Sequence, residues 1–131
     1  MKAVEINEYG GPEVLNIIEV EKPAVDDNNI LVEVKASSVN PVDWKVAKGM
    51  LKFIPGQKLP KRLGSDFAGV VAEVGSNISD FQIGDEVYGV ISAIKGGAYS
   101  NFVLAESHQL SIKPKNIDFA DAATIPLAAL T

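Results

Sequence analysis

Hydrophobic and polar positions alternate along this chain in short runs, which is the pattern of half-buried β-strands. The clearest run is Ile30 to Ala36, where apolar residues alternate with Glu33 and Lys35. Similar runs predict six further strands, at residues 3–7, 15–20, 70–74, 86–91, 98–105 and 109–113. The first two flank the turn cluster Tyr9-Gly10-Gly11-Pro12, so we expect them to pair like a hairpin.

Helix is predicted at two places. A helix is expected over residues 40–48, because Asn40 is a favoured N-cap and Pro41 suits the first helical position. Near the end of the sequence, Asp118 can cap a second helix, which Pro126 interrupts. Many short strands without a regular β-α-β alternation predict a mostly β fold, as a sandwich or a partly open β-barrel with one or two short helices.

The composition is typical of a soluble globular domain, with 131 residues of which 47% are hydrophobic. A net charge of −5 argues against nucleic acid as a partner, because an acidic surface repels phosphate groups. The chain has no cysteine, which excludes disulfides and thiolate metal sites. It has neither an apolar run near the ~20 residues of a membrane span nor a signal peptide at its start. We therefore expect a cytoplasmic protein that binds no membrane.

The motifs of well-known cofactor and nucleophile sites do not occur in this sequence. No G-x-G-x-x-G follows a strand, and no lysine loop of the Walker type is present. A single histidine, His108, excludes a histidine-rich metal site and has no evident serine and aspartate partners. Residues 50–62, with two prolines and four basic residues, are predicted to form an exposed loop.

One cluster of polar residues could form a site, and it consists of Asn40, Asp43, Lys45, Ser65 and Asp66. Asn40 and Asp43 are about one helical turn apart and can share a face. Ser65 and Asp66 lie in a glycine-rich stretch, where a ligand can approach the backbone closely. The alternative is that Asn40 caps the helix, Asp43 and Lys45 are solvated, and Asp66 caps a turn. The residues alone leave both interpretations open.

Five motifs resemble those of the medium-chain dehydrogenase/reductases, in their zinc-free quinone-oxidoreductase branch. They occur in the expected order as N-P-V-D-W-K at 40–45, G-S-D-F-A-G-V-V at 64–71, G-D-E-V-Y-G at 84–89, G-A-Y-S-N-F-V at 97–103 and A-A-T-I-P-L-A-A-L-T at 122–131. In the fourth motif, Ser100 and Asn101 depart from the commonest residues. The resemblance implies a GroES-like catalytic domain over residues 1–117. Residues 118–131 would begin the linker helix towards an absent Rossmann cofactor domain, so the isolated chain is predicted to be inactive.

The resemblance also bears on zinc. Zinc-dependent members of the superfamily carry a cysteine where Asn40 stands and a histidine where Ser65 stands, and both are direct ligands of the metal. Neither an amide nor a hydroxyl is a plausible replacement, because Zn²⁺ prefers thiolate and imidazole ligands. Asp66 would stand near the acidic residue of that site, but a single carboxylate cannot hold the metal. Val42 replaces a hydroxyl residue of the proton relay. We expect no bound metal.

What remains is hydride transfer without a metal. The resemblance implies NADPH as the cofactor, and a quinone or an α,β-unsaturated carbonyl compound (an enone) as the substrate. Lys45 and Asn40 are the predicted catalytic residues, because a cation or an amide near the carbonyl oxygen stabilises the charge that develops there. Ser65 and Asp66 are predicted to line the substrate pocket. The residues predicted to contact the cofactor are Asn40, Val42, Lys45 and Thr131.

Two alternatives stay open at this stage. The chain also fits an enoyl reductase module of the same superfamily, such as those of polyketide synthases. A non-catalytic binding module is conceivable because the barrel resembles that of the co-chaperonin GroES. The resemblance further implies apolar surfaces that a cofactor domain would cover, including Ile125, Leu127 and Leu130. Exposed apolar patches and free strand edges promote association, so we expect a homodimer.

Overall fold

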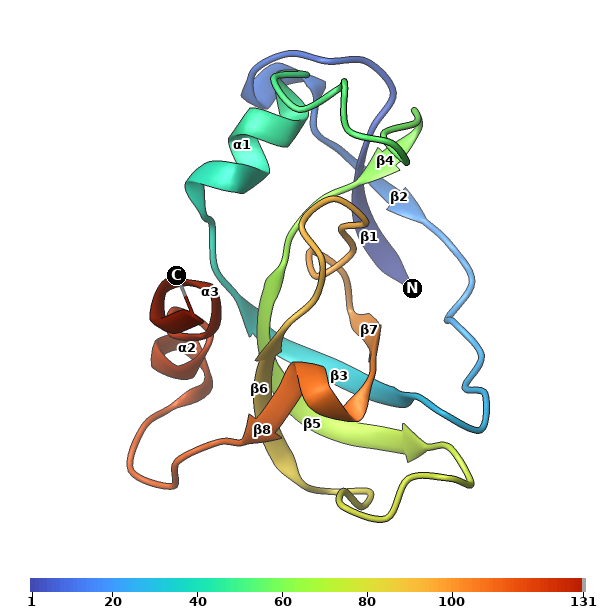
Figure 1. Ribbon diagram of the computed structural model, residues 1–131, viewed down its shortest axis with the longest axis vertical. Helices are drawn as coiled ribbons and strands as arrows, with labels where there is room; N and C mark the ends of the chain where they lie inside the picture. The colour runs from blue at the N-terminus through green and yellow to red at the C-terminus, as the bar shows by residue number, and fades with distance from the viewer. Residues whose placement is uncertain (131) are drawn as a thin grey trace.

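The computed structural model describes residues 1–130, and in this range the protein is mostly β (Figure 1). The elements, in chain order, are β1 (Lys2–Ile6), the 3-10 helix η1 (Pro12–Val14), β2 (Asn16–Glu19), β3 (Ile30–Ser37), α1 (Pro41–Ala47), β4 (Lys61–Arg62), β5 (Asp66–Val74), β6 (Glu86–Val90), β7 (Phe102–Ala105), the 3-10 helix η2 (Ser107–Gln109), β8 (Leu110–Ile112), α2 (Phe119–Ala122) and α3 (Pro126–Leu130). The predicted fold class, a partly open β-barrel with short helices, is confirmed.

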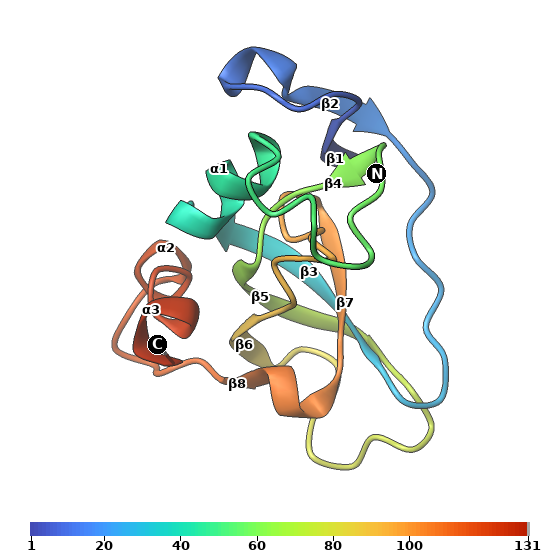
Figure 2. The ribbon, with the colours of Figure 1, turned by 45° about the horizontal axis from the view of Figure 1, so that its top comes forward.

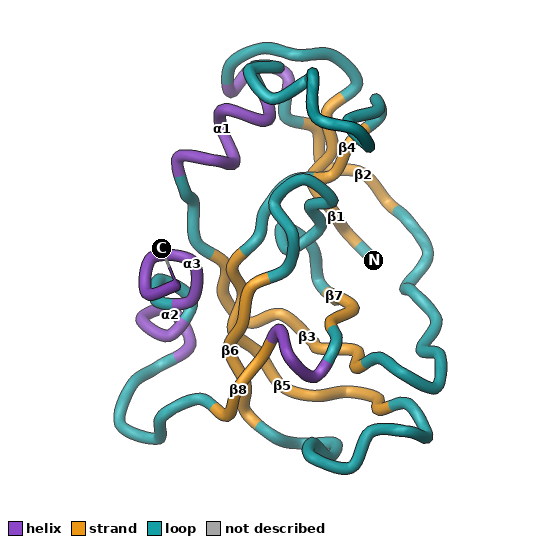
Figure 3. Tube along the Cα trace, viewed as in Figure 1, coloured by secondary structure: helices purple, strands orange, loops and turns teal. Residues whose placement is uncertain are grey.

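The strands form two antiparallel sheets that do not close into a complete barrel (Figure 3). The larger sheet has the order β7-β3-β5-β6-β8, and the smaller one has the order β2-β1-β4. A bridge between Ala3 and Ser100 connects the two, and the Val4 N–H donates to the Tyr99 carbonyl at 2.8 Å. The segment that leads into β7 therefore connects the small sheet to the large one.

Most of the predicted strands are present, and the expected pairing of residues 3–7 with 15–20 is confirmed by β1 and β2. The strand predicted at 70–74 begins earlier, at Asp66. Its first residues include an aspartate and a glycine and look like a turn, but they pair with both β3 and β6, which satisfies their buried backbone groups. The strand predicted at 98–105 is shorter and begins at Phe102.

The prediction of an exposed loop over residues 50–62 is wrong at its end. Lys61 and Arg62 form β4 and pair with Ile6 and Glu5 of β1. Lys61 is only 5% exposed. A strand of two residues is too short to produce an alternating pattern, so the sequence carried no signal for it.

The hydrophobic core has a large part and two smaller ones. The large part is formed mainly by side chains of the five-stranded sheet. It is rich in β-branched and aromatic residues, among them Ile30, Val32, Phe67, Val71, Val87 and Val103. A second part packs α1 against the small sheet through Ile6, Val46 and Leu63. The helix predicted over residues 40–48 is thus confirmed as α1. Its apolar face packs on the small sheet, and this packing fixes the position of the polar residues in its first turn.

The C-terminal helices pack against the large sheet, on the side away from the N-terminus (Figures 1 and 2). Asp118 caps α2 as predicted, since its carboxylate accepts the Asp121 N–H at 2.8 Å. Ala122 and Ala123 are buried against Ala68 of β5. Pro126 does more than interrupt the helix, because it is buried and occupies the first position of α3. That the GroES-like domain ends at residue 117 and the linker begins at residue 118 stays a prediction.

Candidate functional site

The centre of the site is the carboxylate of Asp66, which is completely buried at the start of β5. Its Oδ2 accepts hydrogen bonds from the amide Nδ2 of Asn40 at 2.8 Å and from the hydroxyl of Ser38 at 3.1 Å. Its Oδ1 accepts the backbone N–H of Leu127 in α3 at 3.0 Å. Three neutral donors therefore satisfy this carboxylate, and they tie β5 to the start of α1 and to the C-terminal helix.

A second buried carboxylate, that of Asp43, lies in the first turn of α1 and is 3% exposed. Its Oδ2 accepts the backbone N–H of Asn40 at 2.8 Å and the hydroxyl of Tyr99 at 3.0 Å. A weaker contact of 3.4 Å joins its Oδ1 to the hydroxyl of Ser65. Asp43 thus links the start of α1 to the residue beside Asp66.

The two carboxylates shape the electrostatics of the site. Burial is the main cause that raises the pKa of Asp43, and the nearby charge of Asp66 raises it further, while the hydrogen bonds from Asn40, Tyr99 and Ser65 act against this. The pKa of the Tyr99 hydroxyl is raised by burial and by the charge of Asp43. Tyr99 therefore stays protonated at neutral pH and remains a hydrogen-bond donor to Asp43.

A raised pKa for Asp43 predicts how stability depends on pH. The folded protein binds this proton more tightly than the unfolded chain does, so the contribution of Asp43 to stability falls as pH rises from its ordinary pKa through its raised one. Asp43→Asn removes the charge, and its amide can still accept from Asn40 and donate to Ser65. We expect the variant to gain free energy of unfolding relative to the wild type between pH 4 and pH 8. Urea unfolding at both pH values measures this difference, and a difference independent of pH would contradict it.

Several residues predicted for the site do come together. Asn40, Ser65 and Asp66 are joined directly or through Asp43. The alternative in which Asp43 is solvated and Asp66 caps a turn is wrong, because both carboxylates are buried and Asp66 belongs to a strand. Asn40 is the N-cap residue of α1, but its side-chain amide points to Asp66. The catalytic and binding roles of these residues stay predictions.

Lys45 and Val42 are not among the hydrogen-bond donors to the two carboxylates. They are three residues apart in α1, so they share a face, and both are half-buried. The Lys45 ammonium lies 5.7 Å from the centroid of the Trp44 ring. Within residues 1–130 it has no carboxylate partner at ion-pair distance. Thr131, the other predicted cofactor contact, lies outside the described residues.

Three groups of the site were not predicted from the sequence: the hydroxyls of Ser38 and Tyr99, and the backbone N–H of Leu127. Tyr99 belongs to one of the five motifs, so the motif did mark its position. Nothing in the sequence marks a backbone N–H, because every residue except proline carries one.

An apolar groove of about 200 Å³ opens beside the cluster, between η1 and α1. Its walls include Pro12, Leu15, Val39 and Trp44, and Asp43 and Tyr99 also line it. Three of these apolar side chains, those of Leu15, Val39 and Trp44, are exposed. The groove offers a flat apolar molecule a surface beside hydrogen-bonding groups.

Residues 1–130 contain neither a cluster of possible metal ligands nor a helix that could cross a membrane. No three histidine, cysteine, aspartate or glutamate side chains in this range lie together so that they could hold a metal ion. The range also contains no helix with the length and apolar character needed to cross a membrane. The absence of a metal from the working protein stays a prediction that rests on the residues at positions 40 and 65.

Residues 26–115 match the family model of the alcohol dehydrogenase GroES-like domain. The chain belongs to this family. The matched range carries Asn40, Asp43, Ser65, Asp66 and Tyr99, so the hydrogen-bonded cluster lies within the GroES-like domain itself. Leu127, which donates to Asp66, lies beyond the matched range.

Relatives of this GroES-like domain are oxidoreductases. The chain is 38% identical to a chloroplast envelope quinone oxidoreductase homolog of Arabidopsis thaliana, aligning along its full length with 40% of that protein. It is 41% identical to the NADPH-dependent alkenal/one oxidoreductase of the same plant, of which it covers 36%. Its structure resembles that of Escherichia coli quinone oxidoreductase complexed with NADPH, with a TM-score of 0.85, 35% identity, and coverage of 94% of this chain and 36% of the other. The chain thus spans about two fifths of the length of these relatives.

Proposed function

We propose that this chain is the catalytic part of an oxidoreductase that transfers hydride from NADPH to a quinone or an α,β-unsaturated carbonyl compound without zinc. The observation that carries the proposal is the contact between Asn40 and Asp66, at 2.8 Å, beside Ser65. Amide and hydroxyl groups occupy the positions where the resemblance implies the ligands of a zinc ion, and both are hydrogen-bonded to buried carboxylates. The names of the relatives support the substrate class and the cofactor.

The residues present fit a nicotinamide cofactor. Asp66 orients the Asn40 amide, which offers a fixed polar contact for the nicotinamide end of the cofactor. Val42 and Lys45 present an apolar surface and a cation from one half-buried face of α1. Bound NADPH would supply the hydride, which is chemistry that no protein side chain provides.

The protein's own contribution is positioning and electrostatics. Lys45 has no carboxylate partner among the described residues, so its full charge is free to act on an incoming group. Hydride addition to a quinone or an enone builds negative charge on a carbonyl oxygen, and a positioned ammonium stabilises that charge. The apolar groove beside α1 can exclude water from a flat ring.

The test is an assay of the longer polypeptide that contains this chain joined to a nucleotide-binding domain. We expect NADPH oxidation with a simple quinone or a short-chain enone, undiminished after dialysis against a zinc chelator. NADPH deuterated at the transferred position should label the β-carbon of the enone product. Loss of activity on chelation would contradict the zinc-free mechanism. A strong preference for enoyl thioesters would favour the enoyl reductase alternative, and an inert ring-shaped assembly would favour the binding module.

The 131-residue chain alone should show no turnover of NADPH with the same substrates. It has no dinucleotide fingerprint, so it cannot hold the cofactor in line with the substrate, and such positioning supplies roughly 7–11 kcal/mol in well-oriented reactions. Steady-state measurements with and without the chain give the comparison. Saturable turnover by the isolated chain would show that cofactor binding does not need a further domain.

A further inference from the structure

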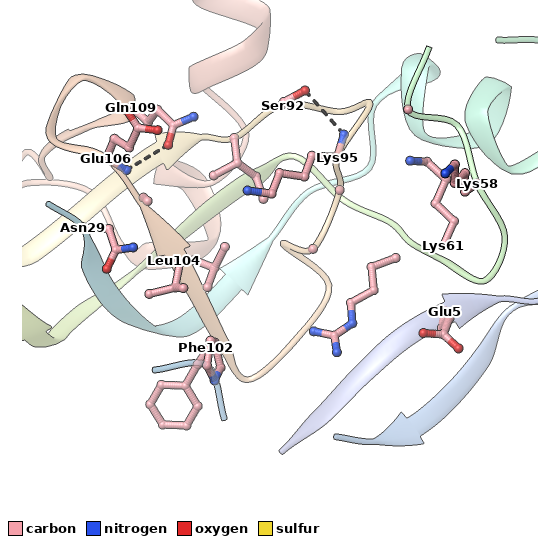
Figure 4. Close-up of a pocket in the computed structure, with 18 of the residues that line it drawn as sticks. Glu5, Asn29, Lys58, Lys61, Ser92, Lys95, Phe102, Leu104, Glu106 and Gln109 are labelled. Atoms are coloured by element: carbon pink, nitrogen blue, oxygen red, sulfur yellow. Dashed lines mark hydrogen bonds between the residues drawn. The ribbon is translucent and has the colours of Figure 1, made fainter. Parts of the chain in front are cut away.

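A second, larger cleft of about 740 Å³ opens on another part of the protein, between β4, β7 and the turn at residues 92–97 (Figure 4). Four basic side chains line it: Lys58, Lys61, Arg62 and Lys95. These are four of the twelve lysines and arginines of the chain, whose net charge is −5. One cleft of an acidic protein thus holds a third of its basic side chains. No residue that bonds to the side chains of Asp43 or Asp66 lines this cleft.

Lys61 is the most informative of the four. The residue is only 5% exposed, and its ammonium donates to the backbone carbonyl of Ile94. No carboxylate among residues 1–130 lies within 4.0 Å of it. An ammonium has three donors and a full charge, and burying it without a counter-ion is unfavourable. Burial accordingly lowers the pKa of Lys61. The protein supplies a buried cation but no anion to match it.

The other three basic residues are also without ion pairs in the described part of the chain. Glu5 lines the same cleft and lies opposite Arg62 in the register of β1 and β4, but the two do not form an ion pair. In Figure 4, Lys58 and Lys61 lie at one end of the cleft and Glu106 and Gln109 at the other, with Lys95 between them. The end marked by Lys58 and Lys61, which Glu5 shares, is therefore the more basic one, and Lys95 borders it towards the middle of the cleft.

We propose that the basic end of this cleft binds a small anion that carries a diphosphate group, with Lys58, Lys61 and Lys95 as its main contacts. Lysine ammonium groups bind phosphate as compact charges, and the arginine fork can grip two of its oxygens. A volume of about 740 Å³ exceeds what a single phosphate needs and lies in the range of small-molecule pockets. The diphosphate group could be free or part of a nucleotide, and the experiment separates the two.

Titration calorimetry of the 131-residue chain with inorganic pyrophosphate at low salt is the first measurement. We expect saturable binding with a dissociation constant below about 1 mM. Lys58→Gln and Lys95→Gln should each weaken it about fivefold, because each removes one charge-assisted contact. Lys115→Gln is the matched control, since Lys115 is exposed and does not line the cleft. It should change the constant by less than about twofold.

Two further variants have distinctive expected outcomes. Glu5→Gln removes a negative charge from the cleft, so it should tighten pyrophosphate binding by about two- to fivefold.

Lys61→Met should weaken binding about tenfold or more without lowering Tm, because it replaces a buried unpaired charge by an apolar chain of similar length. If Lys61→Met does not fold, amide shifts in NMR spectra of the wild type with pyrophosphate should map to residues 58–62 and 92–97.

Absence of saturable binding at 10 mM pyrophosphate (roughly tenfold above the expected constant) would overturn the proposal. So would an equal weakening by Lys115→Gln and Lys95→Gln, because it would show non-specific attraction. ADP is the second probe. Tighter binding of ADP than of pyrophosphate would identify a nucleotide as the source of the diphosphate, and equal binding would identify the diphosphate group alone.

Discussion

Gly69→Ala should lower the free energy of unfolding by about 3–5 kcal/mol, which is a large share of the stability of a domain of this size. Gly69 lies in β5, opposite Val34 of β3. A Cβ atom at this position would lie only 2.0 Å from the backbone carbonyl oxygen of Glu33. The neighbour is backbone in a central strand, so it cannot move aside without separating β3 from β5.

The matched control is Gly84→Ala. Gly84 has a φ of +93° with nothing within 4 Å of a Cβ at that position, so the substitution meets conformational strain but no clash. Its expected effect is about 1–2 kcal/mol. Urea unfolding followed by circular dichroism compares the two variants. A loss for Gly69→Ala that is no larger than that for Gly84→Ala would show that the close approach of β3 and β5 does not require a glycine.

Lys45→Ala should lower kcat/KM by roughly 10- to 1,000-fold in the polypeptide that carries this chain together with a cofactor domain. This expectation rests on the proposed function, in which Lys45 stabilises the charge that develops on the carbonyl oxygen. Its ammonium has no carboxylate partner in the described part of the chain, and its side chain is only half-buried. We therefore expect the Tm of the variant to stay close to that of the wild type.

Lys48→Ala provides a stringent control for this experiment. Lys48 is exposed at the end of α1, and its ammonium lies 5.2 Å from the same Trp44 ring that Lys45 contacts. Lys48 lines the apolar groove that the proposed function assigns to the flat ring, so its loss can change KM, and kcat is the quantity to compare. Removing Lys48 takes away the same charge and a similar ring contact but not the proposed contact with the carbonyl oxygen, so kcat should change less than about threefold. Equal losses in the two variants would assign the effect to the general charge of α1. An unchanged kcat/KM for Lys45→Ala would show that Lys45 has no catalytic role and is a solvated residue of the helix.

The sequence by itself determined the elements whose signals are local. Ile30 to Ala36 alternate in polarity because one face of a strand is buried, and the structure places β3 there. Asn40 and Pro41 start α1 because a cap residue and a fixed φ act on neighbouring residues only. The strand pattern predicted a mostly β fold, as a sandwich or a partly open barrel, and the resemblance of five motifs favoured the GroES-like barrel. It also implied a common site for positions 40, 65 and 66, which the residues alone had left open.

Only the tertiary structure decided that the two carboxylates of the site are buried. The donors to Asp66 come from Ser38, Asn40 and Leu127, which are 28, 26 and 61 residues away in the sequence. A lone aspartate in a glycine-rich stretch looks like a turn residue, since no local pattern reports partners at such distances. The same reason explains β4 and the buried Lys61, because their pairing with β1 bridges more than fifty residues. Burial of a polar group depends on distant donors and acceptors that come into place only when the chain has folded.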